Sequence, residues 1–164
     1  CADIVRDPLP SGLQPLPMPD QPEGPYTAAI QSLIASAGVM PFSGSLLVAA
    51  LGRATTVVVG RAKDDLAAAA HGYLPHNGSS PYHRHAWGGL VAVAEAYRGR
   101  GLGKFINALL AVSVFRDLGA SHIYEMISTS NVASRRMAEA CGLRHDPTFL
   151  CGVATRVEQE RYTR

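Results

Sequence analysis

Between residues 87 and 110 the chain reads WGGLVAVAEAYRGRGLGKFINALL. The segment Trp87–Val93 is almost entirely apolar or glycine, which is typical of a strand buried on both faces. From Leu102 onward the apolar side chains recur at helical spacing, which predicts a helix over Leu102–Leu118 that Gly119 ends. Glycines at positions 99, 101 and 103 separate the two elements. The stretch therefore predicts a strand, a glycine-rich turn and a helix in direct succession.

The glycine turn Arg98–Gly103 has the chemistry of a phosphate site. Glycine permits positive φ and lets a ligand approach the backbone closely. The first turn of the helix that follows offers free N–H groups and the positive end of the helix dipole. Arg98, Arg100 and Lys104 add positive charge around the turn. We therefore expect it to bind the phosphate oxygens of a ligand.

Two common nucleotide-binding motifs do not fit this turn. A Walker A loop needs a Ser or Thr after its Gly-Lys pair, but Phe105 follows Lys104 here, so no hydroxyl can reach Mg²⁺. The dinucleotide fingerprint G-x-G-x-x-G begins at Gly99 and Gly101 but meets Lys104 at the position of its last glycine. Both motifs are therefore excluded.

The chain has 164 residues, which is enough for one domain with a substantial core and short for two. We interpret residues 1–25 as a proline-rich N-terminal arm or edge strand, with Ala2–Arg6 as the candidate strand. The prolines of this segment exclude a helix and any long central strand. Residues 26–164 are interpreted as a single domain.

The remaining segments complete an α/β pattern. Hydrophobic periodicity and glycine or proline punctuation predict the elements. We expect helices over Tyr26–Ala37, Ser43–Leu51 and Asn131–Cys141, strands over Thr55–Gly60, Leu66–Leu74, His122–Ile127 and Phe149–Arg156, a turn at Asp64-Asp65, and a polar loop over Pro75–His85. Antiparallel neighbours come first and strand–helix–strand crossovers follow, so the order predicts a mixed, mostly antiparallel central sheet flanked by helices.

Composition limits the function classes. A net charge of +2 does not indicate a nucleic-acid surface, and no apolar run approaches the roughly 20 residues that span a membrane. Cys1, Cys141 and Cys151 form no disulfide framework, so we expect a cytoplasmic protein. The histidines near residues 71–85 lack a clear fourth ligand, so we expect no metal site. Cys141 ends a predicted helix and is interpreted as a packing residue.

Two motifs together point to one family. The first is R-x-x-G-x-G, read at Arg98, Gly101 and Gly103. The second is Asn131-x-x-Ser134 followed by Cys141-Gly142-Leu143, about 30 residues later and on the expected elements. Their combination resembles the coenzyme A pyrophosphate loop and second signature of the GNAT superfamily of acyltransferases. The resemblance covers roughly residues 55–156. It implies a splayed central strand pair, acetyl-coenzyme A as acyl donor, and an amine as acceptor.

The resemblance also implies roles for individual residues. Val91, Ala92 and Val93 would border the pantetheine arm through their backbone, and the Val93 N–H would hold the oxyanion that develops on the thioester. Asn131 would face the pantetheine or the acceptor, and Ser134 would hydrogen-bond the donor. For this last pair, helix capping on a solvated face is the alternative interpretation. The pyrophosphate would bind at Arg98, Gly99, Arg100, Gly101, Leu102, Gly103 and Lys104.

The chain departs from the family at the catalytic acid. Many members carry a Tyr seven residues after the Asn, and position 138 is Ala here. A general base is also needed, because the acceptor amine is protonated near neutral pH. His85 is the first candidate, because it lies just upstream of Val93 and shares its side-chain parity; His83 and Glu95 come next.

The function expected from these residues is acetyl transfer to a primary amine of a small molecule by direct attack in a ternary complex. Two alternatives stay open. The first is a module that binds acyl-coenzyme A without turnover, which Ala138 favours; the second is an N-acetyltransferase that acts on protein amines. A homodimer is compatible with the sequence, but no residue pattern establishes one.

Overall fold

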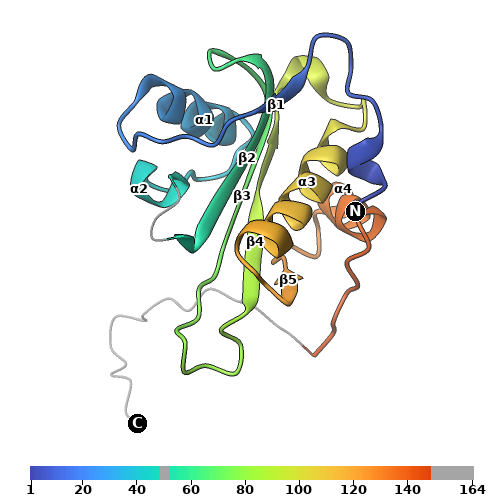
Figure 1. Cartoon of the computed structure of the whole chain (residues 1–164). Helices are drawn as coiled ribbons and strands as arrows, with labels where there is room; N and C mark the ends of the chain where they lie inside the picture. The colour runs from blue at the N-terminus through green and yellow to red at the C-terminus, as the bar shows by residue number, and fades with distance from the viewer. Residues whose placement is uncertain (49–51, 149–164) are drawn as a thin grey trace, which may run out of the picture.

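The computed structural model describes residues 1–48 and 52–148 (Figure 1). Its centre is a five-stranded sheet with the strand order β1-β2-β3-β4-β5. Helices α1 and α2 cover one face of the sheet, and α3 and α4 lie on the other (Figure 1). The sheet is antiparallel from β1 to β4, and β5 joins β4 in parallel. The predicted mixed, mostly antiparallel sheet flanked by helices is confirmed.

The bounds follow the predicted pattern closely. The strands are β1 (Gln14–Leu16), β2 (Ala54–Ala62), β3 (Asp65–Tyr73), β4 (His85–Val93) and β5 (His122–Tyr124). The helices are α1 (Pro25–Ser36), α2 (Gly44–Leu47), α3 (Leu102–Asp117) and α4 (Val132–Ala140), with short 3₁₀ turns η1 (Ile4–Arg6) and η3 (Glu95–Tyr97). No helix within the described residues is long and apolar enough to cross a membrane.

Strand β3 owes its place at the centre of the sheet to four consecutive alanines. Ala67, Ala68, Ala69 and Ala70 are weak strand formers, yet each is 0% exposed. Three of them pack in the core beneath α3, and Ala69 packs in the core beneath α1 and α2. Their small side chains let helices approach both faces closely, so burial outweighs strand propensity here.

Three sequence predictions are wrong in position or length. Ala2–Arg6 is not a strand: it contains the 3₁₀ turn, and the edge strand is β1, whose Pro15 lies opposite Val59 on the sheet margin. The helix predicted over Ser43–Leu51 is a single turn, α2, within the residues described. Strand β5 ends at Tyr124 instead of Ile127. The strand predicted over Phe149–Arg156 lies outside the described residues.

The prediction that β4 is buried on both faces is also wrong. Its residues alternate between buried and half-buried, and the strand contains an irregularity at its centre. Between the pairs Ala69–Ala92 and His71–Gly89, β4 uses one more residue than β3. Leu90, inside this bulge, has a φ of 51°. A bulge bends a strand and increases its twist.

Beyond the bulge, β4 and β5 separate. Their parallel pairing is limited to His85–His122, Ala86–Ile123 and Trp87–Tyr124. The segment from Gly88 to Val93 therefore has no strand partner on its β5 side within the described residues. This separation is the splayed central strand pair that the resemblance implied.

The packing of α3 on β3 generates the first prediction. A methyl carbon at position 72 would lie 2.9 Å from Val114 Cγ2 and 3.1 Å from the Trp87 carbonyl oxygen. Gly72→Ala should therefore lower the free energy of unfolding in urea by about 1–3 kcal/mol, the usual cost of overpacking. Gly78→Ala is the control, because no atom lies within 4 Å of the added carbon there. Equal stability of the two variants would contradict this close contact.

Candidate active site

A cavity of about 450 Å³ lies between the open edge of β4 and the two helices behind it. It extends from the end of β4 over the glycine turn to the first turns of α3 and α4. Its lining residues are Ala37, Val91, Val93, Tyr97, Arg98, Gly99, Gly101, Leu102, Gly103, Lys104, Ala133, Ser134 and Met137. Most of the residues predicted to bind a coenzyme A ligand therefore border one cavity.

The glycine turn has the backbone geometry that its sequence predicted. Gly99 and Gly101 have φ values of 75° and 79°, in the left-handed region that favours glycine. The first helical hydrogen bond of α3 runs from the Phe105 N–H to the Gly101 carbonyl, at 3.1 Å. The N–H groups of Leu102, Gly103 and Lys104 consequently have no partner within the helix. N–H groups in this arrangement at a helix start can bind an anion.

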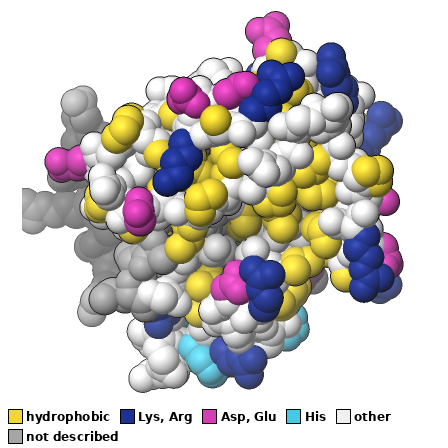
Figure 2. Space-filling model, turned by 45° about the horizontal axis from the view of Figure 1, so that its top comes forward, with side chains coloured by type: hydrophobic (Ala, Val, Ile, Leu, Met, Phe, Trp, Pro, Cys, Tyr) yellow, Lys and Arg dark blue, Asp and Glu magenta, His cyan; other side chains and the backbone are white. Residues whose placement is uncertain are grey.

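Positive charge surrounds this end of the molecule. Lys104 is half-buried and lines the cavity, whereas Arg100 is exposed and does not line it. Arg98 donates from Nε to the Val93 carbonyl at 3.2 Å, which ties the turn to the end of β4. Figure 2 shows hydrophobic side chains gathered at the centre of the face that it draws, with Lys and Arg side chains and several Asp and Glu side chains around them. The arrangement suits a ligand with an apolar arm and a phosphate end.

The backbone of β4 alternates in the direction of its polar groups. Ala94 donates to the Ala67 carbonyl at 2.9 Å, so Ala94 and Ala92 direct their N–H and C=O groups toward β3. The same alternation directs the polar groups of Val91 and Val93 toward the open side. The side chain of Ala92 is 1% exposed in the core, which explains its absence from the cavity lining.

Helix α4 closes the other side of the cavity. The Asn131 side chain accepts a hydrogen bond from the Ser134 N–H at 3.0 Å, so it caps the helix and does not line the cavity. Ser134 and Met137 do line it. Ala138, at the position of the family's tyrosine, is 5% exposed and buried. Helix α4 therefore offers no phenol at this position.

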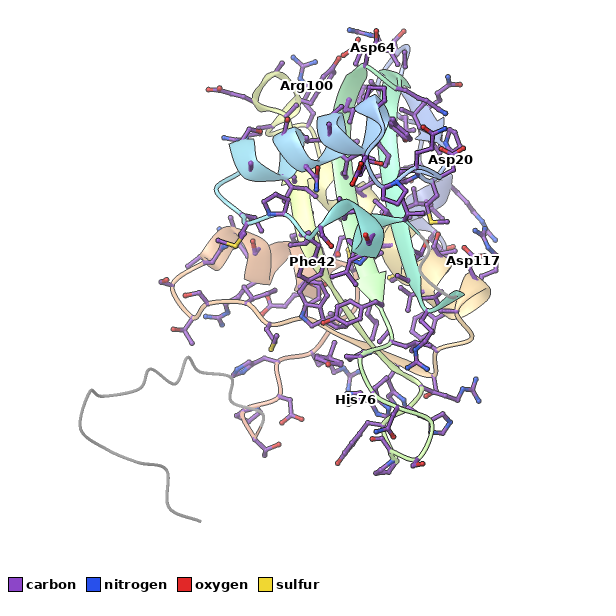
Figure 3. All side chains as sticks on the ribbon, turned by 90° about the vertical axis from the view of Figure 1, so that its left-hand side faces the viewer. Asp20, Phe42, Asp64, His76, Arg100 and Asp117 are labelled. Carbon is purple, nitrogen blue, oxygen red and sulfur yellow. The ribbon has the colours of Figure 1, made fainter. Side chains whose placement is uncertain are left out.

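His85 is not brought together with these residues. It begins β4, eight residues before Val93, which corresponds to roughly 26 Å along an extended strand. Its ring stacks on His122 with the centroids 4.3 Å apart. Burial, and then the charges of His122, His76 and His83, lower the pKa of His85. In Figure 3, Arg100 of the glycine turn and His76 of the histidine loop lie at opposite ends of the molecule.

A buried histidine and three aromatic side chains form a second group, on the sheet face beneath α1 and α2. The sequence did not predict this group. His71 of β3 is 0% exposed and packs against Phe42 and Tyr73, with ring centroids 5.5 Å and 6.0 Å away. Phe42 also contacts Trp87, at 5.6 Å. Burial lowers the pKa of His71 to about 4. Only the cross-strand register brings these residues together, which sequence spacing alone does not specify.

Two sequence signals could have located other parts of the site. Gly88-Gly89 interrupts β4 just before its bulge, and glycine inside a strand often marks a bulge or a close backbone approach. Tyr97 directly precedes the motif that begins at Arg98, and it lines the cavity. Ala37, Ala133 and Met137 carry no chemical signal of their own.

Among residues 1–48 and 52–148, no three His, Cys, Asp or Glu side chains are grouped to hold a metal ion.

The fold and the cavity define a class of protein, and comparisons identify it. A sequence model described as the acetyltransferase (GNAT) family matches residues 21–143. No curated protein sequence matches the chain. Solved structures give broader likenesses at low sequence identity. The structure of AAC(6')-Iy in complex with the bisubstrate analogue CoA-S-monomethyl-acetylneamine is 14% identical in sequence, with a TM-score of 0.66. The match covers 88% of this chain and 99% of that one.

Two further structures show the same fold. Glucosamine-6-phosphate N-acetyltransferase from Arabidopsis thaliana is 14% identical with a TM-score of 0.57, and the match covers 90% of this chain and 97% of that one. An aminoglycoside acetyltransferase from an uncultured soil metagenomic sample, in complex with sisomicin, is 13% identical with a TM-score of 0.59, over 91% and 95% of the two chains.

The chain belongs to the acetyltransferase (GNAT) family. It is an N-acetyltransferase, a member of a family that transfers acetyl groups from acetyl-coenzyme A to amines.

Buried His71 generates the second prediction. Its pKa is about 4 in the folded protein and 6.5 as the ordinary value, so the unfolded chain binds the extra proton between these pH values. Stability should therefore fall as the pH decreases through this window, by on the order of 3 kcal/mol in total. In the His71→Asn variant, this part of the decrease in the free energy of unfolding should be absent from urea unfolding curves measured between pH 7 and pH 4.

The control for this measurement is His145→Asn, which removes an exposed histidine outside the buried group. The control should lose stability on acidification as the wild type does. If His71→Asn shows the same acid loss as the wild type, His71 is not held neutral by burial.

Proposed function

We propose that this protein transfers an acetyl group from acetyl-coenzyme A to a primary amine of a small molecule, by direct attack in a ternary complex. The observation that carries the proposal is the separation of β4 from β5. It leaves the backbone polar groups of Val91 and the N–H of Val93 facing an open edge, beside a glycine turn with free N–H groups. A pantetheine arm can add to such an edge as an extra strand does.

The residues of the cavity take roles in this proposal. The backbone of Val91 and Val93 holds the pantetheine arm, and the Val93 N–H stabilises the oxyanion. The loss of such a donor typically costs on the order of 10²–10³ in rate. The amides of the glycine turn and of the first turn of α3 hold the pyrophosphate, with Arg98, Arg100 and Lys104 supplying charge. Ser134 lines the cavity beside this path, and Asn131 fixes the start of α4.

A small-molecule acceptor is supported by the structural neighbours. The bisubstrate analogue of AAC(6')-Iy joins coenzyme A to an aminoglycoside fragment, and another neighbour acetylates glucosamine 6-phosphate. In this chain, the aromatic side chains of Phe42, Tyr73 and Trp87 pack against one another, and Trp87 lies on β4 just before the strand separates from β5. Aromatic faces attract ammonium groups, so this surface suits an amine.

One observation favours a second candidate, a protein that binds acyl-coenzyme A without turnover. Ala138 is buried and supplies no acid for the leaving thiolate. A coenzyme A thiolate is a tolerable leaving group, so the reaction can proceed with water as the acid. Catalysis therefore stays the leading proposal.

The binding part of the proposal is tested at Gly101. Acetyl-coenzyme A should raise the melting temperature of the wild type, because a ligand that binds only the folded state stabilises it. In Gly101→Val this shift should be lost, since the side chain projects where nothing lies within 4 Å, at the cavity wall. Differential scanning fluorimetry with millimolar acetyl-coenzyme A measures both.

Gly119→Val is the matched control. Gly119 also has a positive φ, 63°, and open space around it, but it follows the far end of α3. Both variants should melt earlier than the wild type because of the same backbone strain. Only the control should keep the ligand-induced shift, and an unchanged shift in both would show that the glycine turn is not the binding site.

Direct attack is tested by initial-rate kinetics. Thiol release should occur with at least one primary amine of a panel that includes neamine, glucosamine 6-phosphate and benzylamine. Varying both substrates should give intersecting double-reciprocal lines, because donor and acceptor are bound together. Parallel lines, with an acetylated protein seen by mass spectrometry, would contradict this mechanism. Binding of acetyl-coenzyme A without release from any amine would favour the binding module.

A further inference from the structure

The imidazole of His71 is held by a chain of two hydrogen bonds. Thr56 of β2 lies opposite His71 in the sheet register, and its Oγ1 is 2.8 Å from His71 Nδ1. The same hydroxyl donates to the Leu47 carbonyl at 2.6 Å. All three residues are buried.

This chain of bonds determines which ring nitrogen carries the proton. A carbonyl oxygen only accepts, so the single hydroxyl proton of Thr56 is used by Leu47. His71 Nδ1 must then donate its own proton to Thr56 Oγ1. Nε2 is consequently left as an acceptor with a free lone pair. Nε2 is buried, and it has no hydrogen-bond partner in the described part of the chain.

The register places this lone pair beside the strand that borders the cavity. His71 pairs with Gly89 of β4, so their Cα atoms are roughly 5 Å apart. Gly89 precedes Val91 by two residues and Val93 by four, which is roughly 7 Å and roughly 13 Å along the strand. Gly89 has no side chain, and the indole of Trp87 occupies the space that a side chain there would fill.

A second buried polar atom without a partner lies in the same group. The indole of Trp87 folds over Gly89, since a methyl carbon at position 89 would lie 2.7 Å from Trp87 Cη2 and Cζ2. Its Nε1 donor is buried and unpaired among the described residues, as His71 Nε2 is. An unpaired buried donor and acceptor each cost free energy unless a ligand satisfies them.

Phe42 covers these two rings. It contacts His71, Tyr73 and Trp87, and it lies on the connection between α1 and α2. Figure 3 shows Phe42 between the glycine-turn end and the histidine-loop end of the molecule. Phe42, Tyr73 and Trp87 are half-buried, whereas His71 is fully buried at the base of the group. The four residues thus form an aromatic box with one free base at its floor.

We infer that this aromatic box of Phe42, His71, Tyr73 and Trp87 receives the acceptor amine, and that Nε2 of His71 is its general base. The inference rests on the proposed acetyl transfer. Thr56 is a positioning residue, which fixes the tautomer of the imidazole through Nδ1. Movement of the Phe42 side chain opens the box to the amine.

The proton balance follows from this assignment. The acceptor attacks as the neutral amine, after its ammonium proton has passed to water. The amine nitrogen forms a bond to the thioester carbonyl carbon, and Nε2 of His71 takes the second proton that the nitrogen loses. The carbon–sulfur bond then breaks, and the thiolate leaves. The imidazolium returns its proton to water, and the thiolate takes one from water, so the products are an amide and a thiol. The low pKa of His71 keeps its lone pair available before the amine arrives.

The test uses His71→Asn, because the asparagine amide N–H can occupy the place of Nδ1–H and still donate to Thr56. The acetyl-coenzyme A melting shift should be retained, while kcat for the best amine of the panel should fall on the order of 10²–10⁴-fold. The control is His145→Asn, which changes an exposed histidine outside the box and should keep wild-type kcat. A His71→Asn kcat within about threefold of the wild type overturns the inference.

A second measurement does not depend on turnover. Nitrogen-15 NMR of the histidine side chains should show His71 protonated at Nδ1 and free at Nε2 at pH 7. Benzylamine added to the protein saturated with coenzyme A should shift the His71 Nε2 signal. A proton on Nε2, or a signal that benzylamine does not move, overturns the inference. If either of these NMR results is seen while the protein still transfers acetyl groups, the proposed function stands. If the protein neither binds acetyl-coenzyme A nor transfers acetyl groups, the proposed function itself is wrong.

Discussion

The site depends on the limited pairing between β4 and β5. The two strands are joined at only three positions, and the bulge around Leu90 comes directly afterwards. If the pairing continued, the backbone groups of Val91 and Val93 would be satisfied by β5 and unavailable to a ligand. Because of the bulge, backbone N–H and C=O groups of β4 lose hydrogen bonds within the sheet and face the cavity instead.

Packing around the bulge explains how the sheet tolerates it. The alanines of β3 are buried on both faces, so the strand next to β4 is held between α3 on one side and α1 on the other. Gly72 and Gly88 leave room for side chains of α3 and β5 at close distance. The rigid part of the sheet thus lies immediately beside its irregular part, and the open edge has a fixed position relative to the first turn of α3.

The sequence predicted the parts of this arrangement that have local chemical causes. Glycine was expected to permit positive φ in the turn, and Gly99 and Gly101 adopt it. The helix after them was expected to begin at Leu102, which is confirmed. The end of β5 was not predictable from its apolar residues, because it is decided by where β4 bends away. The misplacement of the N-terminal strand has a similar origin: β1 is defined by its register with β2, and its own three residues carry little signal.

The two histidines show why local signals mislead at a catalytic centre. His85 shares a strand with Val93 and was therefore the natural candidate for a base. Residues that lie far apart along one extended strand are also far apart in space, however. His71 is far from Val93 in sequence, yet the antiparallel register brings it across from Gly89. A base also needs a free lone pair. Nδ1 of His85 and Nε2 of His71 both lack a hydrogen-bond partner among the described residues, but only for His71 does a hydrogen-bond chain, through Thr56 to Leu47, fix the tautomer. Proximity across the sheet and a fixed tautomer together select His71, and neither can be derived from spacing in the sequence.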